Sequence, residues 1–159
     1  MTRCSAMLPI LAMAALTMPA AAQRSAAEAE VLATTKAFLS VLETRDAEAA
    51  RSLITEETRL TLLRPTQDGT GSRVVTMTGE QFIAAVTRPG GKVKEVMRNP
   101  RIEVDGDLAT VWAEYQVLVD GAVHHCGHDA FQLARKAGAW KVLNVSDTYS
   151  ETGCGPAWE

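Results

Sequence analysis

Three segments in the first half of the chain carry apolar residues at the spacing of an α-helix. The first spans residues 25–45 and has Ser25 as a suitable N-cap. Its apolar stripe is formed by Val31, Thr35, Phe38, Leu39 and Leu42. Asp46 is a suitable N-cap for a second, shorter helix. The sequence TGEQ, which begins at Thr78, has the form of a capping box and predicts a third helix through Val86.

The second half of the chain is rich in strand-forming residues, and tight turns separate its runs. The runs cover residues 93–104, 108–119, 122–135 and 140–147. They are divided by Asp-Gly, Asp-Gly and Ala-Gly dipeptides, and Asp-Gly is a strong signal for a two-residue hairpin. An earlier β-rich run, TRLTLLRP, ends at Pro65 and is followed by a predicted loop, QDGTGS. Pro100 predicts a bulge or an edge position in the first of the four runs.

The order of these segments predicts an α+β fold. We expect a cone-like, strongly curved antiparallel sheet with about three N-terminal helices packed on its concave face. Three stretches make the chain resemble the nuclear transport factor 2-like superfamily: RDAEAARSLI, GDLATVWAEY and DAFQLARKAGAWKV. The resemblance covers roughly residues 27–148. That superfamily includes ketosteroid isomerase, polyketide cyclases, dehydratases, proteins described as lumazine-binding, and domains without chemistry, so the resemblance implies the fold and leaves the activity open.

The first 22 residues have the order of a secretory signal peptide. A short basic start is followed by an apolar stretch and then by three alanines before Gln23. The apolar stretch is short for a membrane span and contains prolines, although a retained membrane anchor is the alternative. The predicted organisation is a signal peptide at 1–22, the domain at 23–148 and a C-terminal tail at 149–159. The mature protein is expected to be secreted or periplasmic, with no membrane association once the signal is removed.

Composition fits a single globular domain of ordinary size. The chain has 159 residues, of which 47% are hydrophobic and 22% charged, and its formal net charge is −3. No run of Lys or Arg offers a surface for phosphate backbones. A nucleic-acid partner is therefore not expected.

The turn at Asp120-Gly121 predicts which side chains share a face of the sheet. If Val119 lies opposite Ala122, then Trp112 lies opposite Asp129, and directly opposed residues share a face. On this register one face carries Trp112, Glu114, Gln116, His125, Asp129, Phe131 and Leu133. The other face carries Val111, Ala113, Tyr115, His124, Cys126, His128 and Ala130.

Asp129 begins a segment, DAFQL, that is similar to a strand of ketosteroid isomerase. The resemblance implies a carboxyl group that apolar surroundings keep protonated. The alternative is an ionised Asp129 that bonds to His125 or to a backbone amide, or that is solvated. The tyrosine and the general base of that enzyme correspond to Phe38 and to Leu62 or its vicinity, so the resemblance does not extend to that activity. His125 is the substitute base, and Glu114 or Asp147 would add a carboxylate.

The histidines and cysteines allow two kinds of site. His124, Cys126 and His128 alternate along one face, but a zinc site needs three or four converging ligands, and the chain has no other histidine cluster. We therefore expect neither a metal nor a cofactor. Cys126 and Cys154 are the cysteines that remain after the signal is removed, and an oxidising compartment favours a disulfide between them, with Cys126 opposite Tyr149. Two unpaired thiols are the alternative.

Together these features predict an exported small-molecule-binding or accessory domain with a hydrophobic pocket. The expected lining is Phe38, Leu62, Trp112, Glu114, His125, Asp129 and Phe131, with Trp140 as a further candidate. The expected ligand is a small apolar or aromatic molecule. The alternative is a lyase, isomerase or hydrolase that uses Asp129 and His125 as acid and base. A third hypothesis is a structural homodimer formed through the open face of the sheet.

Overall fold

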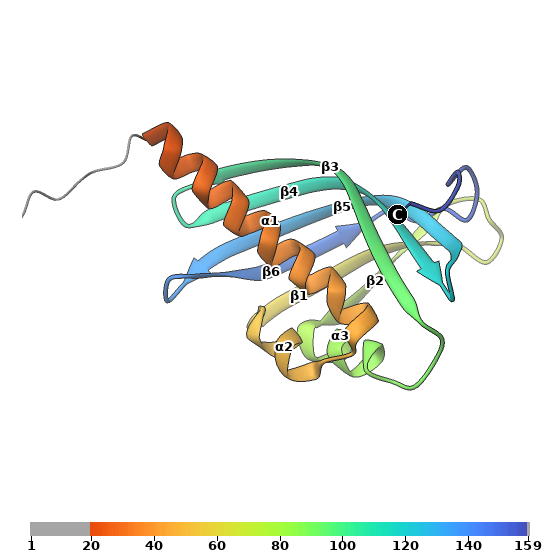
Figure 1. The fold of residues 1–159 in the computed structure, drawn as a ribbon. Helices are drawn as coiled ribbons and strands as arrows, with labels where there is room; N and C mark the ends of the chain where they lie inside the picture. The colour runs from red at the N-terminus through yellow and green to blue at the C-terminus, as the bar shows by residue number, and fades with distance from the viewer. Residues whose placement is uncertain (1–19, 159) are drawn as a thin grey trace, which may run out of the picture.

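The computed structural model describes residues 20–158, so residues 1–19 of the predicted signal peptide lie outside the described part. The elements are α1 (Ala20–Thr44), α2 (Ala47–Ser52), β1 (Ile54–Pro65), β2 (Ser72–Thr78), α3 (Gly79–Val86), β3 (Val93–Asp105), β4 (Leu108–Val119), β5 (Ala122–Lys136) and β6 (Ala139–Asp147). Figure 1 shows a curved sheet with α1 lying across one face and with α2 and α3 together at one end. The predicted α+β class is confirmed.

The sheet differs from the predicted meander in two respects. Its strand order is β2-β1-β6-β5-β4-β3, and β1 pairs with β6 in parallel whereas every other pairing is antiparallel. The strand β2 was not predicted. It forms a hairpin with β1 in which Leu62 lies opposite Val75, and its run RVVTM is rich in the β-branched residues that favour strands. The hairpin extends the sheet beyond β1 and thereby widens the concave face.

The apolar stripe of α1 packs on the concave face, as predicted. Val31, Thr35 and Phe38 are almost completely buried, and the helix packs mainly on β3 and β6. The helix already includes Ala20, the first described residue, so Ser25 lies inside α1 rather than at its N-cap. The alanine-rich stretch before Ser25 has a high helix propensity, which explains why the helix continues past Ser25 towards the N-terminus.

Both short helices begin with the predicted caps. The Asp46 side chain accepts hydrogen bonds from the backbone N–H groups of Glu48 and Ala49 at 3.0 and 2.9 Å. At α3, Gln81 N–H donates to the Thr78 hydroxyl at 3.1 Å, and Thr78 N–H donates to the Gln81 side chain at 2.8 Å. These caps fix where α3 leaves β2.

The three predicted hairpin turns are present, and in two of them both central residues have positive φ, whereas the first has Gly106 with φ of 56°. Asp120 and Gly121 have φ of 50° and 85°, and Ala137 and Gly138 have φ of 50° and 79°. Positive φ at both central residues is typical of a type I′ turn, whose backbone twist matches the twist of the two flanking antiparallel strands. Pro100 lies in edge strand β3 at a register shift between Arg98 and Arg101, which confirms the predicted bulge.

A second irregularity, between β4 and β5, overturns the predicted register. Val119 lies opposite Ala122 and Leu118 opposite Val123, but Val117 lies opposite His125, so His124 is an extra residue in β5. Beyond this bulge every residue of β4 is displaced by one position relative to β5. Asp129 therefore lies opposite Ala113 rather than Trp112. Tyr115, predicted on the outer face, points into the fold instead.

A similar shift affects the C-terminal end of the sheet. Gln132 pairs with Asn144 and Leu133 with Val142, so Leu143 is an extra residue in β6. Cys126 consequently pairs with Ser150 rather than with Tyr149. The predicted disulfide between Cys126 and Cys154 is present, with its Cα atoms 5.5 Å apart.

The C-terminal tail is bound to the outer, convex face of the sheet. Gln116 is fully buried there, and its side-chain amide donates to the carbonyl oxygens of Cys154 and Pro156 at 2.6 and 3.0 Å. It also accepts from the Trp158 N–H at 2.9 Å, and the Arg98 guanidinium lies 4.7 Å from the Trp158 ring centroid. The tail is thus part of the fold. No helix of residues 20–158 combines the length and apolar character needed to span a membrane.

Candidate functional site

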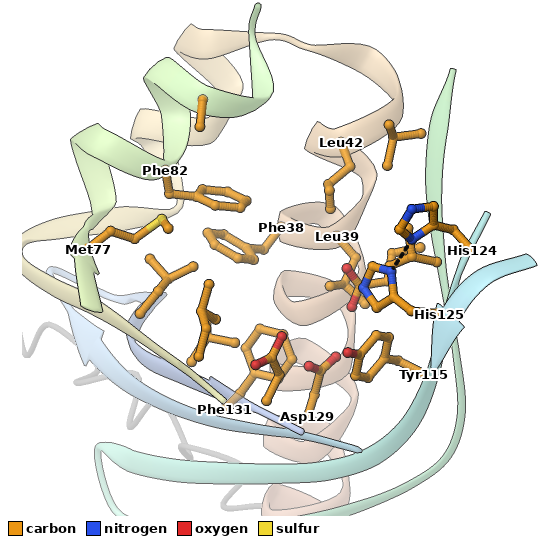
Figure 2. Close-up of a pocket in the computed structure, with 18 of the residues that line it drawn as sticks. Phe38, Leu39, Leu42, Met77, Phe82, Tyr115, His124, His125, Asp129 and Phe131 are labelled. Atoms are coloured by element: carbon orange, nitrogen blue, oxygen red, sulfur yellow. Dashed lines mark hydrogen bonds between the residues drawn. The ribbon is translucent and has the colours of Figure 1, made fainter. Parts of the chain in front are cut away.

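A cavity of about 350 Å³ lies between the concave face of the sheet and the helices α1 and α3. Its residues come from α1, α3 and all six strands: Phe38, Leu39, Leu42, Leu60, Leu62, Arg64, Met77, Phe82, Ala85, Val93, Glu95, Tyr115, Val117, Val119, His124, His125, Asp129, Phe131, Val145 and Asp147. Most of these side chains are apolar. Figure 2 shows Phe38, Phe82 and Met77 on one side of the cavity and Asp129, Tyr115 and His125 on the other.

Aromatic rings from both helices form the apolar end of the cavity. The rings of Phe38 on α1 and Phe82 on α3 are stacked, with centroids 5.0 Å apart and planes at 17°. Phe131 on β5 meets Phe38 edge-on, with centroids 6.0 Å apart. These are the favoured geometries of aromatic pairs. The capping box at the start of α3 is what places Phe82 over the sheet.

Asp129 is the most deeply buried carboxyl at the other end. The residue is 3% exposed, and its Oδ2 atom receives no hydrogen bond from an N–H group or hydroxyl of the described residues. Its side chain contacts the Glu95 carboxyl, and two carboxyls form a hydrogen bond only through a shared proton. In Figure 2 the Asp129 carboxyl points into the cavity. A donor on a bound ligand could therefore replace that proton as the partner of Asp129.

Asp147 lies directly opposite Asp129 in the β5–β6 pair but has its own partners. The Arg64 guanidinium donates to both carboxylate oxygens of Asp147, at 2.6 and 2.8 Å, and Leu63 N–H donates to one of them at 3.2 Å. Such a bidentate pair is strong and directional. Arg64 is thereby bound to Asp147 and not to Asp129.

Glu95 on edge strand β3 lines the same cavity and contacts the Asp129 carboxyl. Burial raises the pKa of Glu95 to about 7; the charge of Asp147 also raises it, while contact with Asp129 and the Arg64 cation lower it. Burial likewise raises the pKa of Asp129 well above its ordinary value, and the charges of Glu95 and Asp147 add to this. The two carboxyls therefore hold a proton at neutral pH. The raised pKa of Asp129 has the direction expected from the resemblance to ketosteroid isomerase, which implies a protonated carboxyl at this position.

Tyr115 and His125 complete the polar end. The Tyr115 hydroxyl donates to the Thr148 carbonyl oxygen at 2.6 Å, and burial raises its pKa, so the phenol stays protonated. His125 stacks on Tyr149 with ring centroids 4.5 Å apart, and its Nδ1 lies 2.9 Å from Nδ1 of His124. Burial lowers the pKa of His125 to about 4, and the charges of His124 and Arg64 act in the same direction. The imidazole is therefore neutral at pH 7.

The structure brings together most of the predicted pocket residues. Phe38, Leu62, His125, Asp129 and Phe131 all line the cavity. Three others do not. Trp112 is 41% exposed on the outer face, where it stacks on His128 at 5.2 Å.

Glu114 and Trp140 are the other two that lie elsewhere. Glu114 is on the outer face with Trp112, and its carboxylate accepts from the Asn99 side chain at 3.3 Å. Trp140 is buried in the core beneath α1, and its indole N–H donates to Glu30 at 3.2 Å. The bulge at His124 explains the two errors in β4, because it turns Ala113, Tyr115 and Val117 inward in place of their neighbours.

Glu95 and Arg64 were not found from the sequence, although each leaves a signal. Glu95 lies between Val93 and Met97 in the inward-facing alternation of β3, where an apolar residue is the rule. Arg64 follows Leu60 and Leu62 at the same spacing in β1. A charged residue at an inward position of a strand indicates a buried partner or a cavity.

Comparison with known proteins identifies the family. The SnoaL-like domain matches residues 23–146. No curated protein matches the chain.

Several solved structures share the fold. A protein of unknown function from Mycobacterium tuberculosis has a TM-score of 0.70 and 15% identity, over 89% of this chain and 82% of that one. A proposed dehydratase of the NTF2-like family from Streptomyces avermitilis has a TM-score of 0.62 and 15% identity, over 85% and 99%. The association domain of CaMKII from C. elegans has a TM-score of 0.61 and 19% identity, over 79% and 97%. The chain belongs to the SnoaL-like domain family, and its fold is that of the NTF2-like proteins.

Proposed function

We propose that this protein is an exported small-molecule-binding domain whose cavity holds a small apolar or aromatic ligand. The apolar body of the ligand would pack against Phe38, Phe82 and Phe131, and its polar group would meet Asp129. Export is supported by the signal-like N-terminus and by the disulfide, because disulfides persist in oxidising compartments.

One observation carries the proposal. The cavity is walled by apolar side chains, yet it ends at a buried carboxyl, Asp129, which receives no N–H or hydroxyl hydrogen bond at Oδ2 from the described residues and contacts a second carboxyl, Glu95. A core that only stabilised the fold would gain from filling such a space and from replacing two buried carboxyls by apolar side chains. A bound ligand would fill the space and could supply a donor to the carboxyls.

The test uses prodan, an uncharged naphthalene dye whose fluorescence shifts to the blue in apolar surroundings. We expect saturable binding to the wild type, together with a ligand-dependent rise in melting temperature. Leu62→Trp would fill part of the cavity and should weaken dye binding by about tenfold or more, since the ring and the dye would compete for one volume. The matched control is Val74→Trp, which adds the same ring at a 62% exposed position of the adjacent strand. Equal dye binding by both variants would contradict the proposal.

Acid–base catalysis is the second candidate, and Glu95 is the observation that favours it. A carboxyl with a pKa of about 7 beside a protonated Asp129 places a base and an acid in one water-poor cavity. His125, the base in the sequence-based alternative, is a weaker candidate because burial lowers its pKa to about 4. Such a pair would suit a lyase or an isomerase that moves a proton within a bound ligand.

The two candidates separate once a ligand that co-purifies is identified by native mass spectrometry. Incubation with that ligand in D₂O, followed by return to H₂O to remove deuterium from O–H and N–H groups, would leave its mass unchanged if the protein only binds it. Catalysis predicts retained, carbon-bound deuterium or a new product with the wild type and at least a hundredfold slower change with Glu95→Gln. Equal rates for the two proteins would rule out Glu95 as the base.

A further inference from the structure

The polar end of the cavity has more carboxyl groups than cations. The titratable side chains that face it are Arg64 on β1, Glu95 on β3, Tyr115 on β4, His124, His125 and Asp129 on β5, and Asp147 on β6. The parts of α1 and α3 that line the cavity add only apolar side chains. Arg64 is the single guanidinium among the lining residues, and both of its bonds to a carboxylate go to Asp147. Glu95 and Asp129 are left without a cation.

Two other hydrogen-bond donors at this end are bound to other groups. The Tyr115 hydroxyl donates to the Thr148 carbonyl, and the Leu63 N–H donates to Asp147. His125 stacks on Tyr149 and contacts His124 through Nδ1, and neither imidazole donates to Asp129 Oδ2. Asp129 Oδ2 therefore receives no hydrogen bond from an N–H group or hydroxyl of the described residues, although the residue is only 3% exposed. In the empty cavity its partner is the proton that it shares with the Glu95 carboxyl.

We infer that this site binds an ammonium group, so that the ligand is an apolar or aromatic amine held by Asp129 and Glu95. The inference rests on the proposed binding function and specifies its ligand class. An ammonium group offers three N–H donors and one positive charge, which matches two adjacent carboxyls that form no ion pair among the described residues and share one proton. The aromatic rings of Phe38, Phe82 and Phe131 then surround the apolar body of the amine, within a cavity of about 350 Å³. A carboxylic acid as ligand is disfavoured by repulsion.

Binding of the amine also has a proton balance. In the empty site the proton held by Glu95 and Asp129 offsets their mutual repulsion. The ammonium ion enters already protonated, takes over that role and forms N⁺–H···O bonds to the carboxylates, so the shared proton leaves to solvent. No covalent bond of the ligand forms or breaks. An uncharged ligand that accepts a hydrogen bond would instead keep the proton in place.

The experiment compares three naphthalene probes of similar shape at pH 7: 1-naphthylmethylamine, 1-naphthylmethanol and 1-naphthoate. Isothermal titration calorimetry with the full mature protein would measure each dissociation constant. We expect the amine to bind at least about tenfold more tightly than the alcohol, and the carboxylate more weakly than either. Titration in phosphate and in Tris, which differ in ionisation enthalpy, should show net proton release for the amine and none for the alcohol. An alcohol that binds as tightly as the amine, or an amine that releases no proton, overturns the inference.

Variants identify the residues responsible. Asp129→Asn and Glu95→Gln keep the shape of each side chain and should reduce the preference for the amine over the alcohol to about twofold. Glu114→Gln makes the same change on the outer face and should leave the preference intact, because Glu114 does not line the cavity. If a cavity variant fails to fold, the three-probe comparison on the wild type still decides. Binding of the alcohol without a preference for the amine refutes only the ligand class, whereas binding of none of the probes refutes the proposed function as well.

Discussion

At the scale of single residues, the unusual feature is a pair of carboxyls inside an apolar cavity. Glu95 and Asp129 are separated by most of two strands in the sequence, and they meet only because β3 and β5 flank β4 in a curved sheet. Asp129 could be identified from the sequence because its segment is similar to the strand of ketosteroid isomerase that carries a protonated carboxyl. Glu95 could not be identified, because its role depends on contact with the Asp129 carboxyl two strands away, and no local sequence pattern predicts that contact.

The raised pKa of Glu95 predicts a pH-dependent effect of Glu95→Gln on stability. A carboxyl whose pKa is about 7 in the folded state and 4.5 in the unfolded state binds its proton more tightly when folded, so its stabilising contribution is complete below pH 4.5 and is lost as the pH rises through 7. Relative to the wild type, Glu95→Gln should therefore gain stability between pH 4.5 and 7.5, by about 1–3 kcal/mol. Urea unfolding at several pH values measures the difference.

The stability of the wild type also depends on pH through His125, whose contribution has the opposite pH dependence. Subtracting the wild-type free energy of unfolding from that of Glu95→Gln at each pH removes this contribution, because both proteins contain His125. Its pKa of about 4 lies below the ordinary 6.5, so its stabilising contribution is present above pH 6.5 and is lost as the pH falls through 4. Glu114→Gln reports the general effect of removing one carboxylate outside the cavity. A difference between Glu95→Gln and the wild type that stays constant from pH 4.5 to 7.5 would show that Glu95 is not protonated as described.

At the scale of elements, the turns, the caps and the bulge marked by Pro100 were predictable, and the bulges in β5 and β6 were not. Asp120-Gly121 and the capping box at Thr78 are read from one or two residues, because the local backbone conformation selects those residue types. The bulges at His124 and Leu143 have no such signature, since they arise from the pairing of long strands in a strongly curved sheet. Each displaces the pairing by one residue. One bulge was therefore enough to place Trp112 inside and Tyr115 outside in the sequence-based register.

Gly127 provides a test of how closely β5 approaches the chain after β6. A Cβ atom at Gly127 would lie 2.2 Å from the Thr148 carbonyl oxygen, the atom that accepts the Tyr115 hydrogen bond. Gly127→Ala should therefore force these segments apart and destabilise the protein by about 2–3 kcal/mol, measured by urea unfolding. Gly71→Ala is the matched control, because nothing lies within 4 Å of its added methyl group. A loss below about 0.5 kcal/mol in Gly127→Ala would mean that the approach is looser than described.

At the scale of the whole molecule, the fold and the disulfide were predictable because they depend on element order and on cysteine count. The strand β2 and its hairpin with β1 were missed, because a polar, glycine-containing loop precedes a short run that was not assigned. The signal peptide, the exported location and the homodimer remain predictions. Solved structures of the same fold include an association domain, so the fold is compatible with assembly.

The disulfide between Cys126 and Cys154 should contribute substantially to global stability. It closes a loop between residues 28 apart in sequence and ties the tail to β5, and loops of this size are stabilised by about 2–4 kcal/mol. The double variant Cys126→Ser/Cys154→Ser should therefore melt at a lower temperature than the oxidised wild type. Added reductant should lower the melting temperature of the wild type towards that of the variant and leave the variant unchanged. Identical melting of the oxidised wild type and the variant would contradict this role.

The tail also limits how two copies could meet. Gln116 satisfies its buried amide entirely with backbone atoms of the tail, at Cys154, Pro156 and Trp158, so this part of the outer sheet surface is occupied by the chain itself. A second copy that bound here would first have to displace the tail, which is attached to β5 by the disulfide. A symmetric dimer formed through this face would therefore use the part of the strands near the exposed Trp112 indole. Deletion of residues 155–159 should change which part of the face is buried in such a dimer, and the dimer should form with or without the deletion.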